Sequence, residues 1–174
     1  MCQAPTVLYS AQQIHARVSE LGNSLSQMIP ISETPHLIAV LKGSVIFLAD
    51  LMRAIRRPVT IDFAYLSSYG SGANSSGAVK TFSAPKSSVR NRHIIIVEDI
   101  VDTGLTLSSL RNQLLDQKPQ SLITVALLTK PSRRRIDVPV ELIGFTVANH
   151  FVVGYGLDFD EKFRQLPHLA VIDR

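Results

Sequence analysis

The sequence predicts an α/β fold with a mostly parallel, twisted sheet flanked by helices. Short aliphatic runs alternate along the chain with longer segments whose apolar residues recur every three or four positions, which is the pattern of strand and helix repeats. The run Ile94–Val97 is purely aliphatic, as in strands that are buried on both faces of a parallel sheet. The chain has 174 residues, of which 45% are apolar. This size fits one compact domain, which we expect to span residues 1–174.

The first predicted element is an amphipathic helix that begins after Ser10. Gln13 stands three positions after this serine, as a capping box requires. The apolar residues that follow share helical spacing: Ile14, Val18, Leu21, Leu25 and Met28.

A strand, a tight turn and a second helix are predicted next. Residues 36–41 form a short apolar run, Lys42 and Gly43 follow it, and apolar residues at helical spacing continue from Ser44 to Ile55. Residues 59–67 predict another strand. Residues 68–77 are too rich in Gly, Ser and Asn for regular structure. Because this loop interrupts a compact chain, we interpret it as a lid over the binding site. We expect the sheet to be parallel except around this loop, where the strands should pair antiparallel.

The second half of the chain continues the alternation. After the strand at 94–97, leucines at helical spacing predict a helix around residues 107–115, and residues 122–128 predict a strand. Three shorter apolar segments, 140–147, 151–154 and 169–172, are separated by turn residues. No internal repeat is present.

Composition excludes several classes of protein. The net charge is only +4, so neither disorder nor a strongly basic nucleic-acid-binding surface is indicated. Twelve of the 18 basic residues are Arg, which suits the recognition of phosphate or carboxylate groups, and only Arg133–Arg135 are clustered. The apolar runs are too short to span a membrane. The single cysteine, Cys2, allows no internal disulfide, so we expect a cytoplasmic protein.

The turn after the strand at 94–97 carries the strongest functional signal. In open α/β sheets, ligands bind at the carboxyl ends of the strands. At the start of a helix, hydroxyl groups and a glycine that allows close backbone approach can bind a phosphate monoester. Carboxylates beside them can accept hydrogen bonds from ribose hydroxyls or hold hydrated Mg²⁺. The residues concerned are Glu98, Asp99, Asp102, Thr103, Gly104 and Thr106. The plainer alternative is that Asp102 caps the following helix and that the other two acids are a solvated strand end.

This turn is neither a Walker loop nor a dinucleotide-binding turn, because the glycine patterns of both are absent. Two acids followed by Asp-Thr-Gly-x-Thr resemble the signature for 5-phosphoribosyl-1-pyrophosphate (PRPP) in the type I phosphoribosyltransferases. Other segments resemble the bacterial hypoxanthine phosphoribosyltransferases, and the resemblance covers about residues 6–172. These segments are Leu41–Ser44, Ser68–Gly70, Lys130–Arg134, Phe151–Asp158 and Arg164.

The resemblance implies a type I phosphoribosyltransferase fold with a small hood and a flexible lid at about residues 68–80. The implied reaction joins a 6-oxopurine, hypoxanthine and also guanine, to PRPP with Mg²⁺ as cofactor, and it releases pyrophosphate. The resemblance also implies a homodimer or homotetramer with small-molecule substrates, and no nucleic acid or membrane as partner.

The resemblance assigns roles to residues around PRPP. The backbone N–H groups of the turn at Lys42 and Gly43, beside a non-proline cis peptide, would bind pyrophosphate, and Arg164 would be a further contact. Backbone and hydroxyl groups would hold the 5′-phosphate: Thr103, Gly104, Leu105 and Thr106. Carboxylates would hold the ribose hydroxyls and the metal: Glu98, Asp99 and, for a second Mg²⁺, Asp158. Ser68 and Tyr69 would move with the lid.

The remaining assigned roles concern the purine. Asp102 aligns with the general base that takes or shares the proton on N7. Lys130 would donate to the purine O6, Phe151 would stack on the base, and the Val152 backbone would meet its edge. An ammonium offers donors only, so adenine, with its 6-amino group, should be rejected.

Two features leave alternatives open. Ala148–His150 replace the usual Ile-Pro-Asp-like segment before the stacking Phe, which bears on the choice among hypoxanthine, guanine and xanthine. Leu105 replaces a residue that is often polar, which should matter little if only its backbone N–H is used. Arg133–Arg135 fit either a solvated turn or a pyrophosphate or subunit contact. The rival functions are a regulatory relative that binds nucleotides and RNA, and a non-catalytic module that binds Mg²⁺.

Overall fold

The computed structural model describes residues 5–68, 80–83 and 87–172, and the side chains of these residues except 66–68 and 80–83. A six-stranded sheet lies at its centre, with the order β4-β3-β2-β5-β6-β7. Its strands are β2 (His36–Leu41), β3 (Thr60–Ser68), β4 (Lys80–Ser83), β5 (His93–Val101), β6 (Ser121–Thr129) and β7 (Leu142–Thr146). All neighbouring strands pair in parallel except β3 and β4, which form the expected antiparallel pair. The predicted lid at 68–80 lies almost entirely outside the described residues.

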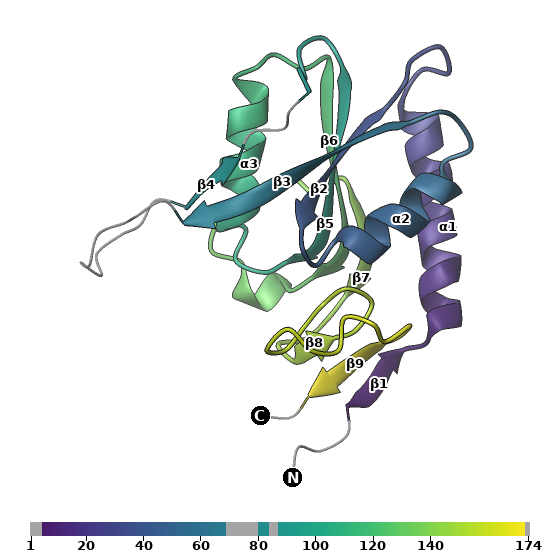
Figure 1. Cartoon of the computed structure of the whole chain (residues 1–174), viewed down its shortest axis with the longest axis vertical. Coiled ribbons are helices and arrows are strands. Elements are labelled where there is room, and N and C mark those ends of the chain that lie inside the picture. Colours follow the sequence, from purple (N-terminus) through teal and green to yellow (C-terminus); the bar gives the residue numbers. More distant parts are fainter. Residues whose placement is uncertain (1–4, 69–79, 84–86, 173–174) are drawn as a thin grey trace, which may run out of the picture.

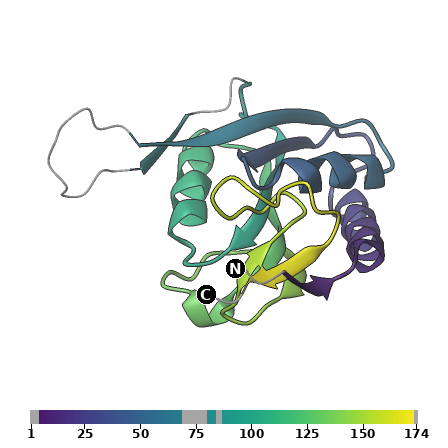
Figure 2. The same ribbon diagram turned by 60° about the horizontal axis from the view of Figure 1, so that its bottom comes forward.

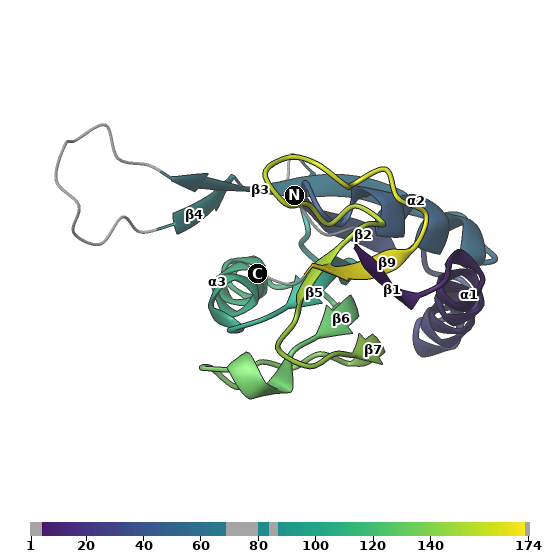
Figure 3. The same cartoon turned by 90° about the horizontal axis from the view of Figure 1, so that it is seen from below.

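Helices cover both faces of this sheet (Figures 1 and 3). Side chains alternate between the faces of a strand, so neighbouring residues of β2 join different cores. Leu37 and Ala39 pack with α1 (Ala11–Met28) and α2 (Val45–Ala54). Ile38 and Val40 pack with α3 (Leu105–Leu115). The mostly parallel sheet and its flanking helices confirm the predicted fold class.

A second, smaller sheet forms the hood. Its antiparallel strands are β1 (Thr6–Tyr9), β9 (Leu169–Ile172) and β8 (Phe151–Val153), in that order. It lies below the carboxyl ends of the parallel strands in Figure 1, and Figure 2 shows the long connection from β8 to β9 beside it. A short 3₁₀ helix, η1 (Pro131–Arg133), follows β6. The hood therefore closes one side of the sheet edge at which ligands bind in such folds.

Two sequence interpretations need correction. The strand β5 was expected to end at Val97, but it continues to Val101, because Glu98, Ile100 and Val101 pair with β6. Glu98 and Asp99 therefore lie in the sheet and not in the turn. The strand β1 was also not expected from the sequence, and it pairs with β9 at the opposite end of the chain. None of the helices among the described residues has the length and hydropathy to cross a bilayer.

The capping box of α1 is present as expected. Ser10 Oγ accepts from the Gln13 N–H at 3.3 Å, and Gln13 Oε1 accepts from the Ser10 N–H at 2.9 Å. These two bonds satisfy donors that the first helical turn leaves unpaired.

Removal of this cap should destabilise the protein. We expect Ser10→Ala to cost about 1 kcal/mol and to lower Tm by about 2–4 °C. Ser19→Ala is the matched control, because the Ser19 hydroxyl donates to the His15 carbonyl within the helix at 2.9 Å, where alanine is favoured. Thermal unfolding by circular dichroism measures both variants. An unchanged Tm for Ser10→Ala would contradict the expected contribution of the cap.

Candidate active site

A cavity of about 430 Å³ lies at the carboxyl ends of β2 and β5. It is lined by residues from the β2–α2 turn, the end of β5, the start of α3 and the connection between β8 and β9. Ten of the sequence-predicted site residues line this first cavity: Lys42, Gly43, Glu98, Asp99, Asp102, Thr103, Gly104, Thr106, Asp158 and Arg164.

The two acids of β5 form the floor of the first cavity. Glu98 is buried, and its Oε2 atom has no hydrogen-bond partner among the described residues. Burial, and after it the charge of Asp99, raises the pKa of Glu98 well above its ordinary value. Burial likewise raises the pKa of Asp99 to about 6, although Asp99 Oδ1 accepts from the Ile100 N–H at 2.8 Å. This pair of acids is therefore an incompletely satisfied polar site that faces the cavity.

The turn between β2 and α2 approaches these acids closely. The Leu41–Lys42 peptide bond is cis, as the resemblance implied. A Cβ atom on Gly43 would overlap the Asp99 carboxylate, so any larger residue would require the turn or the Asp99 side chain to move. The turn thus brings its backbone against the floor of the first cavity.

The start of α3 contributes a second wall. Gly104 precedes the helix with a φ of +83°, and a Cβ there would lie 2.7 Å from the Ile136 carbonyl oxygen. Thr103 Oγ1 accepts from the Leu105 N–H at 3.4 Å. The side chain of Leu105 is exposed and does not line the cavity. The unpaired N–H groups of the first helical turn and the two threonine hydroxyls suit an anion.

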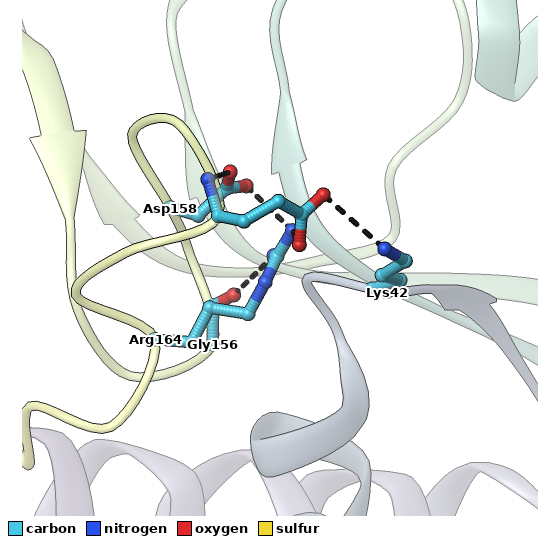
Figure 4. Close-up of polar contacts among 5 residues, drawn as sticks. Lys42, Gly156, Asp158 and Arg164 are labelled. Atoms are coloured by element: carbon cyan, nitrogen blue, oxygen red, sulfur yellow. Dashed lines mark hydrogen bonds and ion pairs between the residues drawn. The ribbon is translucent and has the colours of Figure 1, made fainter.

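Cations and acids meet at the third wall (Figure 4). Arg164 donates to the Gly156 carbonyl at 2.8 Å and pairs with Asp158 at 2.8 Å and with Glu161 at 3.2 Å. Glu161 also pairs with Lys42 at 3.2 Å. These two cations lower the pKa of Glu161, and hydrogen bonds first from Lys42 and then from Arg164 are the main causes.

A second cavity, of about 420 Å³, lies beside the first. It is lined by Lys130 and Phe151, as expected, and by Asn149 and His150 of the segment that bears on the choice of purine. Asp102, Arg133 and Ile172 complete the lining. Lys130 is 8% exposed, so it is a buried residue at the end of β6 and not a solvated surface lysine. Phe151 packs edge-on against Phe159 at 5.4 Å between ring centroids. Val152 is buried and does not line the cavity.

Asp102 lines both cavities. Its Oδ1 atom accepts from Arg133 Nε at 2.7 Å, and Arg133 Nη1 reaches Asn149 Oδ1 at 3.5 Å. Arg134 donates to Thr129 Oγ1 at 2.7 Å. Two members of the arginine cluster are therefore tied to the end of β6 and to Asp102, and they do not form a merely solvated turn.

Glu161 was not predicted as a member of the site, and Arg133 was predicted only as part of a cluster that fits either a solvated turn or a pyrophosphate or subunit contact. Arg133 lay in a recognised arginine cluster, but nothing in the local pattern connects it to Asp102. Glu161 carries no local signal at all. Two of the predicted site residues cannot be placed relative to the cavities. For Ser68 the structure describes the main chain but not the side chain, and Tyr69 lies outside the described residues.

The residues present fit a divalent cation that arrives with a phosphorylated substrate. Among the described residues, no three His, Cys, Asp or Glu side chains form a ready-made metal site. Mg²⁺ is commonly held by one or two carboxylates together with substrate phosphates and water. The unpartnered Glu98 oxygen and the neighbouring Asp99 provide oxygen donors of this kind.

The sheet, the hood and the paired cavities define a class of protein, the type I phosphoribosyltransferases. The phosphoribosyl transferase domain family matches residues 7–160. The chain belongs to this family and, within it, to the hypoxanthine phosphoribosyltransferases.

Two relatives and one solved structure illustrate the similarity. The hypoxanthine-guanine phosphoribosyltransferase of Mycobacterium avium is 44% identical over 173 residues, which cover 97% of this chain and 85% of that protein. The hypoxanthine phosphoribosyltransferase of Salmonella typhimurium is 41% identical over 167 residues, which cover 95% and 94% of the two chains. A crystal structure of the Staphylococcus aureus hypoxanthine phosphoribosyltransferase has a TM-score of 0.88 and 36% identity, and it covers 99% of this chain and 92% of that one.

Proposed function

We propose that this enzyme of purine salvage transfers the 5-phosphoribosyl group of PRPP to N9 of hypoxanthine, and also of guanine, to give IMP or GMP and pyrophosphate. One observation carries the proposal: a cavity suited to anions and a cavity suited to a base share a single carboxylate, Asp102. The bond that breaks and the bond that forms both involve the ribose anomeric carbon, which would lie between the two groups of ligands.

The first cavity suits PRPP. The start of α3, with Thr103, Gly104 and Thr106, supports binding of the 5′-phosphate. Lys42 and Arg164 supply positive charge for the pyrophosphate group, and we assign the ribose hydroxyls to Glu98 and Asp99. As the bond to pyrophosphate breaks, negative charge develops on the leaving oxygens, so cations fixed beside them lower the barrier.

When bound with the substrate, Mg²⁺ would supply further positive charge to the leaving pyrophosphate. Of this chain's residues, Glu98 and Asp99 would hold one Mg²⁺ and Asp158 a second, and all three line the first cavity. Ser68 and Tyr69 belong to the segment that we assign as the lid, whose role would be to exclude water from the reacting carbon.

The second cavity suits a 6-oxopurine. Lys130 would donate to O6, Phe151 would stack on the ring, and the Val152 backbone would meet its edge. Asp102 would accept or share the N7 proton while N9 forms the new bond to the anomeric carbon. The Arg133 contact holds the Asp102 carboxylate at the junction of the two cavities.

A spectrophotometric assay with PRPP and Mg²⁺ tests the proposal. Hypoxanthine, guanine, xanthine, adenine and uracil are offered separately, and turnover of a 6-oxopurine with adenine and uracil inert is expected. Preference for xanthine would revise the purine specificity alone, and would direct attention to Asn149 and His150 in the second cavity. No turnover with any base would overturn the proposed reaction, and a titration with RNA at several salt concentrations would then test the regulatory alternative.

Lys130→Met should impair purine binding selectively. A hydrogen bond to a charged group contributes about 1.5–3 kcal/mol, so we expect kcat/KM for hypoxanthine to fall about 10- to 100-fold, with PRPP affinity unchanged. Lys162→Met is the control, because Lys162 is exposed and pairs only weakly with Asp160, at 3.7 Å. Steady-state kinetics and calorimetric PRPP titration measure the two effects. Equal losses for hypoxanthine and PRPP would contradict a role in base recognition.

We also propose a cytoplasmic enzyme that assembles as a homodimer or homotetramer. The single cysteine in the sequence supports a reducing compartment. Closed symmetric assemblies are the common state of soluble oligomers. Analytical ultracentrifugation distinguishes the dimer from the tetramer.

A further inference from the structure

The Glu161 carboxylate bridges the two cations that the proposed function assigns to pyrophosphate. Its Oε1 atom accepts from Lys42 Nζ and its Oε2 atom accepts from Arg164 Nη2, each at 3.2 Å. Lys42 and Glu161 are separated by 119 positions in the sequence, so the contact arises from the tertiary fold. All three residues line the first cavity.

Neither the main chain of Glu161 nor the guanidinium of Arg164 depends on this bridge. The Glu161 N–H donates to Asp158 Oδ2 at 2.9 Å, which fixes the main chain. Arg164 keeps its contacts with the Gly156 carbonyl and with Asp158. Figure 4 shows Arg164 between Asp158, Gly156 and the turn that carries Lys42. The Arg164 guanidinium is therefore in place whether or not the Glu161 side chain contacts it.

The bridge itself is weakly held. The side chains of Glu161 and Lys42 are 66% and 68% exposed, and ion pairs exposed to this degree contribute little stability. A pyrophosphate group offers several anionic oxygens to the same N–H donors and forms stronger, charge-assisted hydrogen bonds. The Glu161 carboxylate occupies donors on both cations and repels a second anion beside it, so Glu161 and pyrophosphate compete for Lys42 and Arg164.

We propose that Glu161 is an internal competitor of pyrophosphate: its carboxylate occupies Lys42 and Arg164 in the free enzyme and yields both cations when PRPP binds. This inference rests on the proposed function. Glu161 then weakens the binding of PRPP and of the product pyrophosphate, and its return to the cations favours product release. It is a positioning residue that takes no part in bond formation.

Glu161→Gln provides the test, because glutamine keeps the length of the side chain and removes its charge. Calorimetric titration with pyrophosphate and excess Mg²⁺ should show a dissociation constant about three- to tenfold lower than that of the wild-type enzyme. KM for PRPP should fall with it, whereas kcat should stay constant or decrease. Glu161→Asp, which is too short to bridge both cations, should show a smaller gain in affinity. If Glu161 only stabilised the structure of the cavity, Glu161→Gln would instead bind pyrophosphate more weakly than the wild-type enzyme.

Asp160→Asn is the matched control. It removes the same charge one position earlier, at a residue with a similarly positive φ, and Asp160 pairs with Lys162 instead of the cavity cations. Its pyrophosphate affinity should equal that of the wild type. An equal gain for Asp160→Asn, or no gain for Glu161→Gln in an enzyme with normal turnover, overturns the competitor role and leaves the proposed function intact. A wild-type protein that neither binds pyrophosphate nor turns over overturns both.

Discussion

Replacement of Asp102 by asparagine is expected to lower turnover by two to three orders of magnitude, with PRPP affinity changed by less than about twofold. General base catalysis typically contributes factors of this size. Asparagine has nearly the same shape and retains an oxygen that can accept from Arg133 Nε, so the walls of both cavities should stay in place. The amide cannot take up the purine proton at neutral pH, however, and only the chemical step should suffer.

Single-turnover kinetics and calorimetric PRPP titration separate these two expectations. The loss should appear in kcat and in kcat/KM for hypoxanthine alike, which marks an interaction made in the transition state. Unchanged turnover would remove Asp102 from the mechanism. A large loss of PRPP affinity would instead assign Asp102 to substrate binding.

Arg133→Gln distinguishes the effect of the Arg133–Asp102 ion pair on turnover from the effect of the Asp102 carboxylate itself. This variant breaks the 2.7 Å contact between Arg133 and Asp102 but retains the carboxylate. The two side chains are 47% and 37% exposed, so the pair contributes little to stability. We expect turnover to fall less than about tenfold. A loss as large as that of Asp102→Asn would show that orientation by Arg133, and not proton transfer, limits the reaction.

Local patterns account for the parts of the fold that the sequence predicted well. The boundaries of α1 follow from a serine cap, a glutamine three positions later and a regular apolar stripe, all within the cap and the 18 residues of the helix. The buried strand around Ile94–Val97 was recognisable because a run of aliphatic residues has few alternatives inside an α/β domain.

Long-range contacts account for what was missed. The four residues of β1 include strand formers but are too few to establish a pattern, and they become a strand by pairing with β9. Glu98 and Asp99 are polar, so they indicated a turn, but pairing of Glu98 with Ala126 continues the ladder. Tertiary pairing thus overrides local propensity at the strand end that carries the site.

The same distinction holds for the site residues. The motif from Glu98 to Thr106 is contiguous, and the structure gathers almost all of it around one cavity. Arg133 and Glu161 act on residues 31 and 119 positions away, so no local spacing could reveal them. A sequence motif identifies the groups that would meet the substrate, whereas the fold alone identifies the side chains that hold those groups or compete for them.

Gly43→Ala should reduce turnover by at least 100-fold with only a moderate loss of stability. The added methyl group would overlap the Asp99 carboxylate, so either the β2–α2 turn or Asp99 must move. Displacement by about 1 Å of a group that positions substrate can cost about 100-fold in rate. The overpacking itself should cost about 1–3 kcal/mol and lower Tm by several degrees.

Gly22→Ala is the matched control for this substitution. A Cβ on Gly22 would lie 2.6 Å from the Cβ of Ala54, in the contact between α1 and α2 and outside both cavities. We expect a comparable decrease in Tm with unchanged turnover per folded molecule. Kinetics at a temperature well below both transitions, together with thermal unfolding, compare the two variants. If Gly43→Ala kept wild-type turnover, the turn would tolerate a side chain, and its close approach to Asp99 would not be required for catalysis.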